Sequence, residues 1–369
     1  MNNKKTGLEG FFSVVVSVAL LVVTLVFSGD LVTALSSFAL GSFSVMKSVS
    51  VFKAENEKYN LEKSDDYNVS GFGNGLETNT TGTDTKTPDD IKKIMNEAVS
   101  AYASFKKTGD IEETHLGASS NNTIYKNVVV NNKTETKSVN IKKELSKKPS
   151  FGKITKDEPY ILIYHTHTTE GYELLDKGWY SSQYDSRTKD INKTVVRVGD
   201  EIAERLEKSG FKVIHDKTIY DASYNGAYGR SLKNVEKILE ENPSIVITLD
   251  VHRDAIHYDS GTRCKPTAEI NGKKAAQVMI ISGAEEGEIE DYPDWAQNLT
   301  FAIALQEKVE EDYKGLMRPL FFCQRKYNMH VTPCSLLLEM GTDANTLDEA
   351  VYSGRLIGDS LAELLEENM

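Results

Sequence analysis

The sequence has little cysteine, and its cysteines form no pattern that could hold a fold together. Three occur in 369 residues, Cys264, Cys323 and Cys334, and none stands in the C-x-x-C spacing of a structural zinc site. Because an odd number cannot all pair within one chain, we expect no disulfide framework. A single bridge between Cys323 and Cys334, the nearest pair in sequence, stays open if the chain is exported.

A basic surface is also lacking. The net charge is -12 and the isoelectric point is near 5.2, whereas a protein that binds nucleic acid needs clustered Lys and Arg. We therefore expect no nucleic-acid partner. The hydrophobic fraction of 39% and the charged fraction of 27% are ordinary for a folded protein with some polar linker. The length allows one sizeable domain with appendages, or two modest domains.

Charge is absent altogether from residues 10–29, which are dominated by Val, Leu and Phe. An apolar run of about 20 residues matches the hydrocarbon thickness of a bilayer, so residues 1–30 are predicted to contain one transmembrane helix. A cleavable signal peptide has a shorter apolar core and a small-residue cleavage site, and no such site precedes Asp30. Lys4 and Lys5 lie before the run, which favours a cytoplasmic N-terminus and places the rest of the chain outside the cell membrane.

The next part of the chain is polar. Residues 31–150 are predicted to be a juxtamembrane segment and a largely disordered tether, because Asn, Thr, Ser, Lys and Asp dominate from about Glu55 onward. Apolar residues at helical spacing predict one short helix within it, over residues 88–106.

Short apolar runs alternate with amphipathic helices over residues 151–369, the predicted folded domain. The predicted strands are 160–164, 211–214, 245–249, 277–282 and 335–339, and the predicted helices are 193–208, 231–240, 295–313 and 347–366. This alternation predicts an α/β fold with a mostly parallel sheet flanked by helices. In such sheets the active site lies at the carboxyl ends of the strands.

Polar side chains gather at three of these strand ends. They are His165, His167 and Glu170 after the first strand, Asp250, His252, Arg253 and Asp254 after the third, and Glu339 at the end of the last. Catalytic zinc sites use three protein ligands plus a water, and neutral imidazole is a favoured ligand. We therefore predict His167 and His252 as zinc ligands and Glu339 as the general base and acid.

Each of these residues also has an ordinary structural interpretation. A lone histidine at a strand end is usually a hydrogen-bonding residue, and Glu339 alone could cap the following helix. Residues two apart in an extended chain face the same side, so His165 and His167 either ligate together or act as a ligand and its support. The joint placement of these groups is what favours a metal site.

Six blocks of the sequence, in this order, resemble a known family. They are ILIYHTHTTEGY (161–172), VVRVGDEIAERLEKSGFKVIHDKT (195–218), SYNGAYGRS (223–231), LDVHRDA (249–255), INGKKAAQVM (270–279) and LLLEMGTDANTLDEA (336–350). The chain thereby resembles the stage II sporulation protein P family, the engulfment-stage cell-wall hydrolases of endospore-forming Firmicutes. The resemblance covers residues 156–369, and the anchor and variable tether fit it as well.

The resemblance implies a domain similar to that of the zinc-dependent N-acetylmuramoyl-L-alanine amidases. It implies a peptidoglycan substrate, with cleavage of the amide between muramic acid and L-alanine and of peptide cross-links. It also implies a membrane complex with stage II sporulation proteins D and M, acting on the outer side of the cell membrane at the septum between mother cell and forespore.

Compared with the amidase pattern, His167 takes the position of the first zinc histidine and His252 that of the second. Glu339 in Leu-Glu-Met-Gly matches the catalytic glutamate of the amidase Val-Glu-x-Gly block. Arg253, Arg230 and Asn225 are the residues that we expect to bind the peptide carboxylates or sugar oxygens of the substrate.

The middle zinc ligand departs from the pattern. Amidases take it from a glutamate near the start of the first long helix, and no glutamate occurs here between Glu173 and Glu201. Glu170 is our preferred substitute, with His165 and Asp190 as alternatives.

Two other functions fit this sequence less well. A wall-binding or scaffold module that has lost catalysis has no need of a general base such as Glu339. A metal-dependent glycan deacetylase also uses ligands like His-x-His, but the downstream blocks do not fit that pattern.

Overall fold

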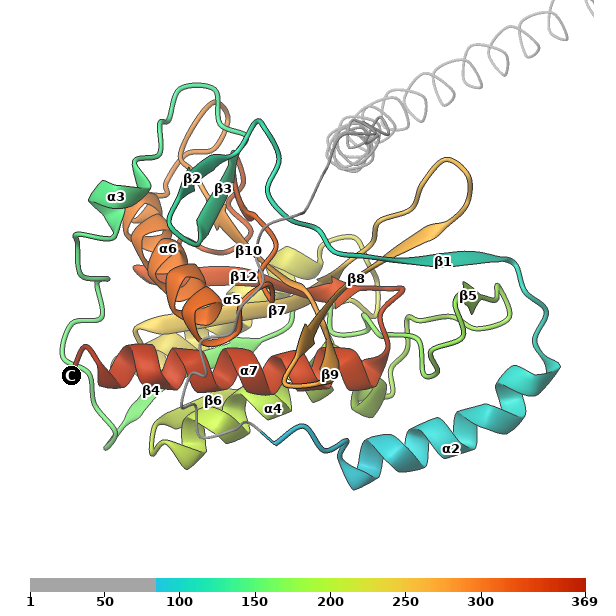
Figure 1. Ribbon diagram of the computed structural model, residues 1–369. Helices are drawn as coiled ribbons and strands as arrows, with labels where there is room; N and C mark the ends of the chain where they lie inside the picture. The colour runs from blue at the N-terminus through green and yellow to red at the C-terminus, as the bar shows by residue number, and fades with distance from the viewer. Residues whose placement is uncertain (1–83) are drawn as a thin grey trace, which may run out of the picture. The chain divides into compact units, whose positions relative to one another are not determined.

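A mixed sheet of eight strands forms the centre of the domain, in the order β2-β3-β11-β10-β12-β7-β4-β6 (Figure 1). All neighbouring strands pair in parallel except β2 with β3 and β10 with β12. The strands are β2 (Thr123–Tyr125), β3 (Val128–Asn132), β4 (Pro159–Tyr164), β6 (Lys212–His215), β7 (Ile247–Asp254), β10 (Val278–Gly283), β11 (Leu320–Cys323) and β12 (Cys334–Thr342). The predicted α/β fold with a mostly parallel sheet is confirmed for this part of the chain.

This computed structural model describes residues 84–369. The predicted transmembrane helix within residues 1–30 lies outside the described residues. Within residues 84–369, no helix combines the length and the apolar character needed to cross a bilayer.

Helices cover both faces of the sheet. On one face, α4 (Val195–Lys208), α6 (Trp295–Asp312) and α7 (Leu347–Glu366) share a hydrophobic core with alternate residues of the central strands, among them Ile161 and Ile163. On the other face, Val235 of α5 (Ala227–Glu241) packs with Leu162 and Tyr164. Because β4 is buried on both sides, its sequence is a continuous apolar run without alternation.

Residues 107–150, which we expected to be a tether, are part of the fold. Strands β2 and β3 extend the central sheet, with Val128 and Val130 buried, and α3 (Ile141–Glu144) packs nearby. The boundary predicted at residue 151 therefore lies inside one compact unit. These strands have only three and five residues, too few for a periodic signal in the sequence.

A second sheet of four strands was not predicted. Its order is β5-β1-β8-β9, with β1 (Gly109–Thr114), β5 (Trp179–Tyr180), β8 (Arg263–Ile270) and β9 (Lys273–Ala276). Strand β1 has the sequence GDIEET and buries none of its residues fully. Backbone pairing with β8 holds it, and this does not depend on an apolar pattern.

Two central strands are longer than predicted. Strand β7 continues to Asp254, so Asp250 and His252 lie within it and not after it, and β12 continues to Thr342, so Glu339 lies inside that strand and not at its end. Near its end β12 bulges at Gly341, whose φ is +77°, and a Cβ at this position would lie 2.7 Å from Oδ1 of Asn345. Glycine is therefore the residue that this bulge accommodates.

The helix predicted over 88–106 is confirmed as α2 (Asp89–Ser104). The hydroxyl of Tyr102 on its buried side donates to Oε2 of Glu173 at 2.8 Å. This bond ties α2 to the segment that follows β4.

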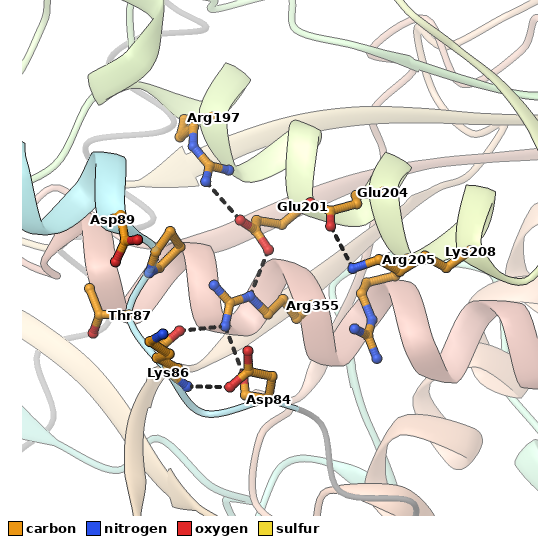
Figure 2. Close-up of a pocket in the computed structure, with 11 residues that line it drawn as sticks. Asp84, Lys86, Thr87, Asp89, Arg197, Glu201, Glu204, Arg205, Lys208 and Arg355 are labelled. Carbon is orange, nitrogen blue, oxygen red and sulfur yellow. Dashed lines mark hydrogen bonds and ion pairs between the residues drawn. The ribbon is translucent and has the colours of Figure 1, made fainter.

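A buried arginine holds the segment before α2. Arg355 of α7 contacts Oε2 of Glu201 on α4 at 2.6 Å, and it donates to the backbone carbonyls of Asp84 and Lys86 at 2.7 and 2.8 Å (Figure 2). Arg197 bridges Glu201 and Asp90 at 2.8 and 2.7 Å. We call these contacts the Arg355 clasp.

Replacing Arg355 by Met should destabilise the protein, because Glu201 would keep its buried charge with one of its two arginines gone. Loss of a buried partner costs about 3 kcal/mol, and this loss should appear in urea unfolding. The freed segment 84–88 should also become susceptible to limited proteolysis.

The matched control is Lys208→Met, which removes an exposed pair with Glu204 on the same helix. It should cost about 0.5 kcal/mol or less. An Arg355→Met protein that unfolds at the wild-type urea concentration would contradict a stabilising clasp.

Candidate metal and active site

Three side chains from two adjacent strands converge at the carboxyl end of the sheet. They are His167 and Glu170, which follow β4, and His252 of β7, and one ligand atom from each lies within 4.8 Å of the others. Strands β4 and β7 pair in parallel with Tyr164 opposite Asp250, which brings the turn after β4 beside His252. All three side chains are buried.

The distances within this cluster suit a tetrahedral metal ion. Nδ1 of His167 lies 3.3 Å from Oε1 of Glu170, and Nδ1 of His252 lies 3.3 Å from Oε2 of Glu170. Two ligands bound to one zinc ion at about 2.0–2.1 Å with tetrahedral angles are themselves about 3.3 Å apart. Two imidazoles and a carboxylate are also a donor set found in catalytic zinc sites.

Glu170 is held in its charged form. Burial opposes ionisation, but hydrogen bonds from His167 and His252 keep the pKa of Glu170 well below its ordinary value. Arg187 adds a contact of 3.0 Å to Oε1 of Glu170 and a second of 3.0 Å to Asp221. Asp221 in turn accepts hydrogen bonds from the backbone and the hydroxyl of Thr169. Arg187 and Asp221 thus hold both Glu170 and Thr169, its neighbour in the sequence.

His252 also has a carboxylate behind it. Its Nε2 lies 2.8 Å from Oδ1 of Asp250, which is itself bonded by the backbone N–H and the hydroxyl of Thr166. Burial opposes protonation, but the charges of Asp250 and Glu170 raise the pKa of His252 well above its ordinary value. A carboxylate behind a ligating histidine is the usual support in metal sites, because it orients the ring and raises its basicity.

Glu339 lies beside the cluster. It pairs with His252 across β12 and β7 and is 6% exposed, and its Oε2 has no hydrogen-bond partner among residues 84–369. Burial, and next the charge of Asp254, raise the pKa of Glu339 to about 8. Asp254 is paired with Arg318 at 2.9 Å. This carboxyl group is therefore poised to hold a proton near neutral pH.

His165 lies outside the cluster of three. Its Nδ1 is 2.9 Å from the carbonyl oxygen of Val251, and its Nε2 is 2.8 Å from Nε2 of His215, so both ring nitrogens are occupied. Burial and the neighbouring His215 lower the pKa of His165 to about 3. Gly199 of α4 leaves room for the two rings, because a Cβ there would lie 2.7 Å from His215. The structure thus leaves His165 out of the cluster, and its role as a support for His167 stays a prediction.

The other predicted site residues bond to the backbone of loops or to neighbouring side chains. Asp190 lies at the start of a short 3-10 helix (Ile191–Lys193), pairs with Lys193 at 2.9 Å and is not in the cluster. Arg253 donates to the carbonyl of Gly171 and to Ser186, and Arg230 donates to the carbonyls of Tyr220, Ser223 and Asn225. These arginines hold loops in this structure, and contact with a substrate stays a prediction. None of the three cysteines forms a disulfide, and all three are buried.

Sequence reasoning gave no role to two tyrosines that surround His167. The ring of Tyr224 stacks on the imidazole at 4.7 Å between centroids with an angle of 24°, and Tyr228 meets it edge-on at 5.5 Å and 70°. Both lie in the block SYNGAYGRS, so the block itself was the available signal.

With this geometry in place, comparison with known proteins identifies the family. The model of the stage II sporulation protein P family matches residues 78–362. The chain belongs to that family. A curated member from Bacillus subtilis is 29% identical over 244 residues, which make up 63% of this chain and 56% of that protein. The chain thus spans little more than half the length of this relative.

The chain is also similar to solved structures of amidases, and the similarity is low. The CwlD amidase of Clostridioides difficile, solved in complex with the GerS lipoprotein, is 16% identical, with a TM-score of 0.34 over 56% of this chain and 99% of that one. The catalytic domain of CwlV, an N-acetylmuramoyl-L-alanine amidase from Bacillus (Paenibacillus) polymyxa, is 14% identical, with a TM-score of 0.32 over 56% and 98%. At these values the likeness is distant.

The buried Glu339 predicts a pH dependence of stability in the metal-free protein. The pKa of Glu339 is about 8 in the folded protein and 4.5 in an unfolded chain. Between these two pH values the folded state therefore keeps a proton that the unfolded state loses. The free energy of unfolding should fall as the pH rises from 4.5 towards 8, by an amount on the order of a few kcal/mol.

Urea unfolding with a chelator present, at a series of pH values, measures this slope. Glu339→Gln is uncharged at every pH and should lose the part of the slope that Glu339 causes. Parallel slopes for the wild-type and Glu339→Gln proteins would contradict the raised pKa.

Proposed function

We propose that this protein is a membrane-anchored, zinc-dependent peptidoglycan hydrolase of endospore engulfment. Its reaction is cleavage of the N-acetylmuramoyl-L-alanine amide, together with cleavage of peptide cross-links. The observation that carries this proposal is the cluster of His167, Glu170 and His252, with Glu339 beside it, whose Oε2 has no hydrogen-bond partner among the described residues. Membership of the stage II sporulation protein P family supports the cell-wall substrate.

In this proposal His167, Glu170 and His252 hold the zinc ion. When bound, zinc lowers the pKa of a coordinated water towards neutrality and polarises the carbonyl oxygen of the substrate. Asp250 orients the ring of His252, and Arg187 orients the carboxylate of Glu170. Because these supports are buried or bonded to further residues, the three ligands are arranged before any metal arrives.

Glu339 performs the proton transfers. Its carboxylate takes the proton from the attacking water and delivers it to the nitrogen of the leaving amine as the amide C–N bond breaks. Burial raises the pKa of Glu339, so the group can both accept and release a proton near neutral pH.

An idle wall-binding module is the alternative, and the burial of Glu339 speaks against it. A buried carboxyl with an unpartnered oxygen is destabilising, and a domain kept only for binding gains nothing from it. Such a group is expected where catalysis needs it.

Zinc content and muropeptide products test the mechanism in the full chain. His252→Ala should lose both zinc and amide cleavage, since a ligand is gone. Glu339→Gln should keep one zinc per chain and lose cleavage by about 10²–10⁴-fold, the usual contribution of a general acid and base.

The control is His115→Ala, which removes an exposed histidine that contacts the carbonyl of Thr267. It should leave zinc content and product release unchanged. Unchanged cleavage by Glu339→Gln would overturn the mechanism, and a wild-type protein that binds the cell wall without cleaving it would favour the idle module.

We further propose that residues 10–29 anchor the protein in the cell membrane, with the hydrolase domain on the outer side facing the septal wall and stage II sporulation proteins D and M as partners. The charge-free run in the sequence and the family membership support this arrangement.

Two lysines in the run, Val18→Lys with Val22→Lys, should move the protein from the membrane fraction to the soluble fraction. Each charge at the centre of a transmembrane helix costs about 2.5–3.5 kcal/mol on insertion scales. Val18→Leu with Val22→Leu is the control and should stay with the membrane after alkaline extraction. If the lysine variant stays there too, these residues are not the anchor.

A further inference from the structure

One large exposed side chain stands at the candidate active site. Among the described residues, the exposed large hydrophobic side chains are Val99, Ile124, Tyr224 and Met369. Tyr224 is the aromatic one, and it alone of these four contacts a residue of the metal cluster. It is 51% exposed although its ring stacks on His167.

The loop that carries Tyr224 is fixed at both ends. Arg230 donates to the carbonyl groups of Tyr220, Ser223 and Asn225, and Asp221 is bonded to Thr169 beside the metal cluster. These contacts hold the backbone of the loop, and the stacking on His167 holds the ring, so a ligand that packs on Tyr224 has little ordering entropy to overcome.

The ring lies beside the place where a substrate's reacting amide would have to be. Tyr224 touches the imidazole of His167 at 4.7 Å, and the guanidinium carbon of Arg187 lies 5.2 Å from its centroid. A group that packs on Tyr224 is therefore adjacent to the scissile bond, on one side of it.

The two sides of that bond differ chemically. One side is a muramoyl sugar, whose pyranose chair presents a face of weakly positive C–H groups, and the other is a flexible peptide with carboxylates. The face of an aromatic ring is negative, so it suits the C–H face of a sugar better than it suits a carboxylate.

We propose that Tyr224 is the platform on which the pyranose ring of the muramoyl residue packs, and that it selects the amide that carries a sugar. This inference rests on the proposed amidase function and adds to it the residue that recognises the glycan side of the substrate.

The test compares two substrates that share the same amide. One is a muramoyl-L-alanyl peptide, and the other is the matched D-lactoyl-L-alanyl peptide, which keeps the acyl group and lacks the pyranose ring. The value of kcat/KM is measured on both substrates for the full-length wild type, Tyr224→Ala, Tyr224→Phe and, as an exposed hydrophobic control, Ile124→Ala. Zinc content per chain is measured for every variant.

Tyr224→Ala should lower kcat/KM on the muramoyl substrate about tenfold, mainly through KM, and change it little on the lactoyl substrate. Tyr224→Phe keeps the ring and should retain the wild-type preference for the muramoyl substrate, as should Ile124→Ala.

An equal loss on both substrates would overturn the proposal, as would loss of zinc in Tyr224→Ala, because either result would show that Tyr224 only holds His167 in place. A wild-type protein that cleaves neither substrate would instead contradict the proposed amidase function itself. The two failures are therefore distinguishable.

Discussion

The parallel pairing of β4 with β7 is the constraint on which the site depends. Its register sets Tyr164 opposite Asp250, so the turn after β4 must pass beside His252 two residues further along. A shift of one residue would turn His252 to the other face of the sheet, away from Glu170. The same strand β4 packs into the hydrophobic core on both faces, so the core and the arrangement of the cluster depend on one element.

Around this pairing the domain buries an unusual amount of charge. Glu170, Asp250, Asp254 and Glu339 are all less than a tenth exposed, and one end of one sheet holds them together. Arginine and histidine partners offset most of this charge, as Arg318 does for Asp254. Among these four carboxyl groups Glu339 differs, since its Oε2 has no hydrogen-bond partner among the described residues and its pKa is raised. Such local cost is typical of residues retained for function.

The sequence predicted well what depends on local pattern. Apolar periodicity predicted the strands β4, β6, β7, β10 and β12 and the helices α2, α4, α5, α6 and α7. The structure brings His167, Glu170 and His252 together, and each of them stands at or near a strand end. Pairings between segments that are distant in the sequence produce no local apolar pattern, so they were not predicted. Strand β1 has no apolar face, and the contact of Arg187 with Glu170 joins a loop to a ligand across 17 residues. The role of His165 likewise depended on His215, 50 residues away.

The Arg355 clasp also limits how much of the chain could separate the domain from the anchor that we propose. For a chain anchored through residues 10–29, at most residues 31–83 could lie between anchor and domain, and not residues 31–150, because the clasp attaches the chain to the domain at residues 84 and 86. A fully extended chain spans at most 3.3–3.6 Å per residue, so the largest reach falls from about 420 Å to about 190 Å. Under the proposed anchoring, the clasp thereby keeps the domain within this distance of the membrane.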